Sequence, residues 1–129
     1  MENLKTYLVP LGRLLMSGLF IWAGIGKVRF PGGNAEYFAA VHVPAPEVMV
    51  WIVAIFEIVF GVALLVGFQT RWAAAGLAIF CLITGFAVHL PVGDLANMIQ
   101  FYKNLAMTGG LLYAVAYGAG GISVDGKSA

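Results

Sequence analysis

The stretch VMVWIVAIFEIVFGVALLVGF, residues 48–68, contains only one charged residue, Glu57. An α-helix rises about 1.5 Å per residue, so about 20 apolar residues cover the roughly 30 Å hydrocarbon core of a bilayer. Three further apolar stretches of similar length occupy residues 8–26, 72–90 and 101–118. The pattern predicts an all-α integral membrane protein, folded as a bundle of four transmembrane helices.

The composition agrees with this fold class. Hydrophobic residues make up 61% of the chain, charged residues 10%, and the mean hydropathy is +0.92. Soluble domains average about 25% charged residues. The segments between the stretches are short, so we expect one domain, residues 1–129, and any soluble catalytic module has to come from a partner chain. A net charge of +1 provides no basic field for nucleic acid.

The longest connector, residues 27–47, follows the first stretch. Pro31 and the two glycines after it are expected to break the first helix. Asn34 is expected to cap a short helix that ends near Ala40 and either lies at the membrane interface or folds over the mouth of the bundle.

Four spans place both termini on one side of the membrane, and the distribution of Lys and Arg predicts that this side is cytoplasmic. The predicted cytoplasmic side carries Lys5, Arg71 and Lys127, with Arg13 if its side chain extends to the interface, and the other side carries Lys27, Arg29 and Lys103.

Arg13 and Glu57 lie inside predicted spans, where a charged side chain costs a few kcal/mol and needs a partner. Counted from the expected outer ends of their helices, the two residues differ in depth by about 5 Å. We therefore expect Arg13 to pair with Glu57, because a guanidinium can hold a carboxylate in a bidentate manner. Such a pair has two interpretations: it fixes the helix register, or it anchors a ligand or a proton.

A second polar set gathers near the outer mouth of the predicted bundle. Taken singly, such residues are typical of helix caps and interfacial side chains. Together, Lys27, His89 and Lys103 form a cationic mouth suited to a small anion or a quinone carbonyl, and His89 can exchange protons near neutral pH. The set comprises Lys27, Arg29, His42, His89, Asp94, Lys103 and Asn104.

Three other signals carry no function. Residues 121–128, GISVDGKS, match the P-loop pattern, but no strand precedes them and no long helix follows, so we expect no nucleotide binding. Cys81 is a lone thiol inside a span and is expected to be a small buried apolar residue. Because His42 and His89 are placed at loop depth, we expect no metal or haem site.

The order and spacing of several short motifs resemble the DoxX family over residues 8–125. The motifs are Arg13-Leu14-Leu15, Ala23-Gly24-Ile25-Gly26-Lys27, Val43-Pro44-x-Pro46, Glu57-x3-Gly61-x2-Leu64-Leu65-x-Gly67, Thr70-Arg71, His89 and Ser123-Val124-Asp125. The resemblance implies a four-helix protein of a bacterial or archaeal plasma membrane. Some members are subunits of a thiosulfate:quinone oxidoreductase, others join superoxide-detoxifying and sulfurtransferase partners, and distant animal relatives are assembly chaperones.

The sequence therefore leaves several functions open. The first is a membrane subunit of a quinone-linked or redox-stress oxidoreductase complex, with a soluble or membrane redox partner, in which a polar pocket takes a quinone or a small anion. The second is a non-catalytic scaffold or assembly chaperone, and the third is a small-solute carrier. A homo-oligomer is compatible with each of these functions. For the first function, the catalytic candidates are Glu57, Arg13 and His89, and the substrate-binding candidates are Lys27, Lys103 and Asn104.

Overall fold

The computed structural model describes residues 2–128, with the side chains of residues 3–126, and every regular element in this range is a helix. The elements are α1 Glu2–Arg29, α2 Pro31–Ala40, α3 Pro46–Val66, α4 Thr70–Thr84, the π-helix η1 Gly85–His89, α5 Leu90–Val92, α6 Leu95–Tyr117 and α7 Val124–Ser128. The expected all-α class is confirmed.

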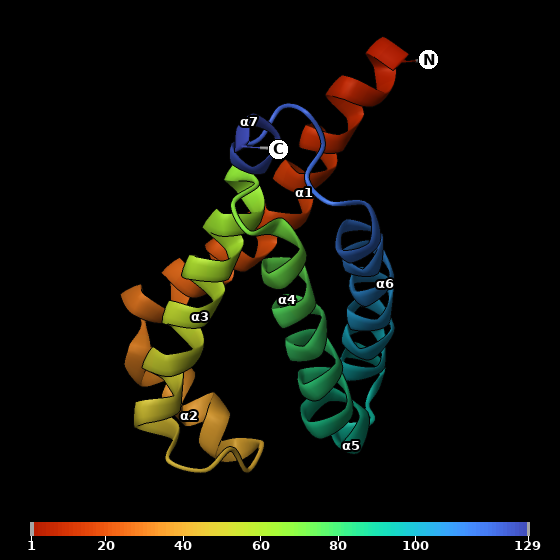
Figure 1. The fold of residues 1–129 in the computed structure, drawn as a ribbon. Helices are drawn as coiled ribbons and strands as arrows, with labels where there is room; N and C mark the ends of the chain where they lie inside the picture. Colours follow the sequence, from red (N-terminus) through yellow and green to blue (C-terminus); the bar gives the residue numbers. More distant parts are fainter. Residues whose placement is uncertain (1, 129) are drawn as a thin grey trace.

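The long helices form two packed pairs, α1 with α3 and the continuous α4–η1–α5 segment with α6 (Figure 1). The short turn between α3 and α4 joins the pairs. The pairs lie close together at the end that carries α7 and diverge toward the end that carries α2 and α5. We call these the closed end and the open end of the bundle.

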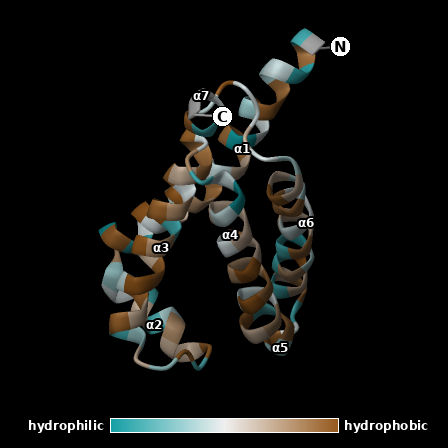
Figure 2. Ribbon diagram, viewed as in Figure 1, coloured by the Kyte–Doolittle hydropathy of each residue, from teal (hydrophilic) through white to brown (hydrophobic). Residues whose placement is uncertain are grey.

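Three helical segments are long and apolar enough to cross a membrane, namely Asn3–Arg29, Pro46–Val66 and Thr70–Val92. Figure 2 shows that hydrophobic residues dominate α3, whereas hydrophilic residues interrupt α6. α6 has 23 residues, enough for a span, but its first half carries Asn97, Gln100, Lys103 and Asn104. The fourth span, expected at residues 101–118, therefore stays a prediction.

The connector after α1 agrees with the expectation in part. α1 ends at Arg29, just before Pro31, and a short helix, α2, ends at Ala40, but α2 begins at Pro31 and not after Asn34. Proline suits the first turn of a helix because backbone N–H groups there have no acceptor within the helix, so the N–H that proline lacks costs no hydrogen bond. The two glycines after Pro31 lie inside α2 and do not break it. Asn34 donates its side-chain amide to the carbonyl of Phe30, at 2.8 Å, instead of capping a helix.

The third span contains a π-helical turn, Gly85–His89. Leu90 donates its N–H to the carbonyl of Gly85, five residues back, and Pro91 has no N–H to donate. This π-turn contains one residue more than a regular α-helical turn and so changes the direction in which His89 projects. Such π-turns are frequent at functional sites.

The chain after α6 folds back onto the closed end. Asp125 accepts hydrogen bonds from the N–H groups of Gln69 and Thr70, both at 2.8 Å, and from the Thr70 hydroxyl at 2.6 Å. A carboxylate at this position replaces a local N-cap for α4 and meets the positive end of the helix dipole. Gly67 has φ +74°, and a Cβ there would clash with Cβ of Ser123, so only glycine fits.

α1 and α3 approach most closely at two glycines. A Cβ on Gly24 would lie 2.9 Å from the Ala54 carbonyl oxygen and 2.7 Å from Cγ1 of Ile58. A Cβ on Gly61 would lie 2.8 Å from Cγ1 of Ile21. Small residues permit such contacts between membrane helices. They fix the register in which the polar residues of α1 and α3 face each other.

Gly24→Ala is expected to lower stability by about 1–3 kcal/mol, because the added methyl group has to displace the α3 backbone. The matched control is Gly26→Ala, since no atom lies within 4 Å of a Cβ there. Thermal unfolding in mild detergent measures both variants, and equal melting temperatures would contradict this register.

Asp125→Asn is expected to loosen the closed end at neutral pH. Hydrogen bonds from the Thr70 hydroxyl and N–H hold the pKa of Asp125 below its usual value, with smaller contributions from Gln69 and Arg13. A carboxyl with a lowered folded-state pKa stabilises the fold above its unfolded pKa and loses this effect as pH falls through the folded pKa. The melting temperature of the variant should therefore be lower than that of the wild type at pH 7, and the difference should shrink in acid. A constant difference across that pH range would show that the charge of Asp125 is unimportant.

Candidate functional site

Arg13 lies at the closed end and is only 6% exposed. Its Nη1 donates to the carbonyls of Leu64 and Leu65, at 3.3 and 2.7 Å, and its Nη2 donates to the carbonyl of Ile122. These acceptors belong to the last turn of α3 and to the returning C-terminal segment. Arg13 therefore caps the C-terminus of α3 and ties it to that segment.

The expected Arg13–Glu57 pair is wrong, because Glu57 pairs with Lys27 of the same helix as Arg13. Nζ of Lys27 lies 2.8 Å from Oε1 of Glu57, and the two side chains are 16% and 5% exposed. The register explains the difference: Gly24 faces Glu57, so Lys27 is within reach, while Arg13 faces Gly67. The prediction had aligned the outer ends of two helices that do not end at the same level.

A cavity of about 660 Å³ lies at the open end, between the two helix pairs and against α2. Its walls are mainly apolar and come from α1, α2, α3, the α4–η1 segment and α6. It contains five of the six candidate residues predicted from the sequence, namely Lys27, Glu57, His89, Lys103 and Asn104. The sixth, Arg13, lines a different cavity at the closed end.

His89 enters this cavity with one ring nitrogen already engaged. Nδ1 of His89 lies 2.9 Å from Oδ1 of Asn97. The amide group of Asn97 donates to Asp94 at 2.8 Å, which leaves Oδ1 of Asn97 as the acceptor for the His89 N–H. Nδ1 is therefore protonated, and Nε2 is the nitrogen free to accept a proton.

Asp94 fixes this chain of hydrogen bonds. It is the N-cap of α6 and accepts from the backbone N–H of Asn97 at 2.8 Å. These bonds from Asn97, first the backbone and then the side chain, lower the pKa of Asp94, so it stays an acceptor. The role of Asn97 was not predicted. Its signal in the sequence is the Asp-x-x-Asn spacing at a helix start.

Asn104 mainly links α6 to α4, and only part of its side chain is available to a ligand. Its side-chain amide donates to the carbonyl of Cys81 at 3.1 Å and to the hydroxyl of Thr84 at 2.8 Å. Both amide hydrogens are thus used, and only Oδ1 is left for a substrate. Cys81 is 1% exposed, as expected for a small buried residue.

The remaining candidates differ in exposure. Lys103 is exposed at the cavity rim, and so is His42, whose backbone has φ 65°. In the part of the chain that the structure describes, no group of three or more His, Cys, Asp or Glu side chains is arranged to hold a metal ion. The site therefore consists of an ion pair, an oriented imidazole and a rim cation in an apolar cavity.

Lys27→Gln is expected to destabilise the protein by on the order of 3 kcal/mol, because it leaves the Glu57 carboxylate buried without a countercharge. The double variant Lys27→Gln, Glu57→Gln removes both charges and should recover most of that loss. Thermal unfolding of the two single variants and the double variant in detergent gives the coupling energy. Additive losses would show that the pair does not form.

The sequence comparisons agree with this architecture. The DoxX family model matches residues 8–90. Inner membrane protein YqjF of Escherichia coli K12 is 38% identical over 125 residues, which cover 97% of this chain and 95% of that protein. Inner membrane protein YphA of the same organism is 29% identical over 126 residues, which cover 94% and 90%. No solved structure matches the chain. On the strength of the family match and of the first of these similarities, the chain belongs to the DoxX family of membrane proteins.

Proposed function

We propose that this protein is a membrane subunit of a quinone-linked or redox-stress oxidoreductase complex, and that the open-end cavity binds a quinone headgroup. The cavity of about 660 Å³ carries this proposal. Its size lies within the roughly 300–1,000 Å³ typical of small-molecule sites, which combine apolar walls with a few placed polar groups. A quinone headgroup has the same character, an apolar ring with two carbonyl oxygens.

Each polar residue has a part in this proposal. Lys103 at the rim and Lys27 inside offer N–H donors to a carbonyl oxygen, or to a small sulfur anion in its place. Glu57 is the protonatable group, and Lys27, instead of Arg13, is its countercharge. His89 supplies or takes a proton through Nε2, because Asn97 holds Nδ1. Reduction of a quinone to a quinol takes two electrons and two protons, and in this proposal the electrons come from a redox partner protein.

The proposed location is the inner membrane of a bacterium, with both termini in the cytoplasm. Two relatives are inner membrane proteins by name. Lys5 and Arg71 belong to the terminal side, where the positive-inside rule favours cytoplasmic placement. Lys127, which also enters that prediction, lies outside the described side chains. The open-end cavity then opens toward the outer half of the membrane.

A scaffold or assembly chaperone is the second candidate, and the contacts of Arg13 favour it. Both Nη groups of Arg13 donate to backbone carbonyls of this chain, which holds α1, α3 and the C-terminal segment together. A buried charge whose Nη groups bind backbone carbonyls in this way supports packing. This role explains the Arg13 contacts at the closed end but does not explain the open-end cavity.

Glu57→Gln and His89→Gln are each expected to weaken the binding of a photoreactive quinone analogue about tenfold, the effect of losing one hydrogen bond to a charged or oriented group. The measurement is concentration-dependent labelling of the purified full chain in mild detergent. The control is Glu47→Gln, because Glu47 is an exposed carboxylate at the start of the same helix. If Glu57→Gln lowers stability, the Lys27→Gln, Glu57→Gln double variant replaces it.

Affinity isolation of the same variants, with mass spectrometry of copurified proteins, separates the alternatives. Full quinone labelling and intact partner assembly in both variants would refute the proposal. A stable partner together with no affinity for quinone in the wild type would establish the scaffold. Solute flux in liposomes would establish a carrier.

A further inference from the structure

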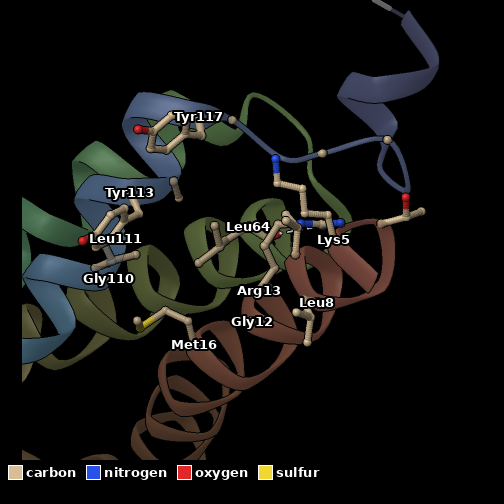
Figure 3. A pocket seen from close by; sticks show the side chains of 16 residues that line it. Lys5, Leu8, Gly12, Arg13, Met16, Leu64, Gly110, Leu111, Tyr113 and Tyr117 are labelled. Atoms are coloured by element: carbon tan, nitrogen blue, oxygen red, sulfur yellow. Dashed lines mark hydrogen bonds between the residues drawn. The ribbon is translucent and has the colours of Figure 1, made fainter. Parts of the chain in front are cut away.

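A second cavity, of about 800 Å³, lies between α1 and the C-terminal half of α6 at the closed end. We call it the α1–α6 groove. Figure 3 shows Leu8, Gly12 and Met16 on the α1 side and Leu111 on the α6 side. None of these side chains carries a charge, so most of the groove wall is apolar and suits a hydrocarbon chain.

Two cations line the groove, and none of the described residues that line it is acidic. Lys5 is exposed near the start of α1, and Arg13 lies two turns deeper, about 12 Å along the helix. Asp125 faces the guanidinium of Arg13 from α7 and offsets part of its charge. Lys5 is therefore the cation available to an anion at the groove mouth.

Arg13 has a donor that this chain does not use. The residue is 6% exposed, and its Nη atoms bind carbonyls, but its Nε is buried and has no hydrogen-bond partner among the described residues. Buried N–H groups are nearly always paired, so an unpaired one beside a cavity points to an acceptor that comes from outside the chain.

The groove also lies at the depth where lipid headgroups begin. Tyr113 and Tyr117 are 71% and 80% exposed at this end, and Trp72 is 77% exposed. Exposed tyrosine and tryptophan gather at the membrane–water interface. A ligand held between Lys5 and Met16 therefore extends from the interface into the hydrocarbon.

We propose that the α1–α6 groove binds one anionic phospholipid. An acyl chain lies between α1 and α6, the phosphate pairs with Lys5, and an ester oxygen of the glycerol accepts from Nε of Arg13. A phospholipid has an apolar chain that fills the groove, a negative charge that pairs with Lys5 and an oxygen that accepts from Arg13. The inference does not depend on quinone binding at the open end, because the two cavities share no described lining residue.

The test is native mass spectrometry of the purified full chain in mild detergent, titrated with phosphatidylglycerol or with phosphatidylcholine of the same acyl chains. Phosphatidylglycerol is expected to bind at least fivefold more tightly. Lys5→Gln should weaken its binding about fivefold, the effect of one basic residue at an anionic headgroup. Arg29→Gln is the control, because Arg29 is an exposed cation at the opposite end that lines neither cavity, and its loss should leave the affinity unchanged.

Filling the groove tests the acyl chain separately. Gly12→Leu should weaken the binding of phosphatidylglycerol at least fivefold, since Gly12 lines the groove and no atom lies within 4 Å of a Cβ there. Gly18→Leu is the control on the same helix, equally open but outside the groove. Equal binding of the two lipids, or full binding by Lys5→Gln and Gly12→Leu, would overturn the proposal. A dimer that Gly12→Leu dissociates would overturn it in favour of a second copy of the chain.

Discussion

The close approach of α1 and α3 at Gly24 and Gly61 determines how the charged residues of this protein are paired. Without side chains at these two positions, the helix backbones come close enough for Lys27 to reach Glu57. The same register places Arg13 at the last carbonyls of α3. A shift by one helical turn would leave the carboxylate facing apolar side chains and the guanidinium without acceptors, which is costly inside a membrane.

Much of the fold follows from the sequence because the apolar stretches are long and nearly free of charge. The polar residues of the cavity were also identifiable, since five of six predicted candidates meet there. The pairing of Glu57 with Lys27 was not identifiable, because it depends on where each helix begins and ends. α1 ends before Pro31, as expected, but the next helix then starts at Pro31 and runs through two glycines, residues of low helix propensity. Asp125 illustrates the same limit: its contact with Thr70 spans 55 residues, and no local pattern encodes it.

The two ends of the bundle treat their polar groups differently. At the closed end, Arg13 and Asp125 bind backbone groups, so the charges replace helix caps that the local sequence lacks. At the open end, the helix pairs diverge, and their polar side chains meet around a space instead of filling it. Arg13 also borders a cavity, but its Nη groups are bound to carbonyls of this chain, whereas Lys103 and His42 at the open-end cavity are exposed.

The open end also contains the π-turn and a chain of hydrogen bonds. Pro91 has no N–H, and its ring would clash with the carbonyl four residues back in a regular helix, so the π-turn accommodates the proline inside the span. The turn also sets the direction of His89, one of two histidines that line the cavity. At the start of α6, hydrogen bonds between Asp94 and Asn97 and between Asn97 and His89 orient that ring. The proline accounts for the irregular turn, whereas the hydrogen bonds that link Asp94, Asn97 and His89 orient an imidazole at the cavity, and they favour a protein that handles a ligand or a proton at its open end.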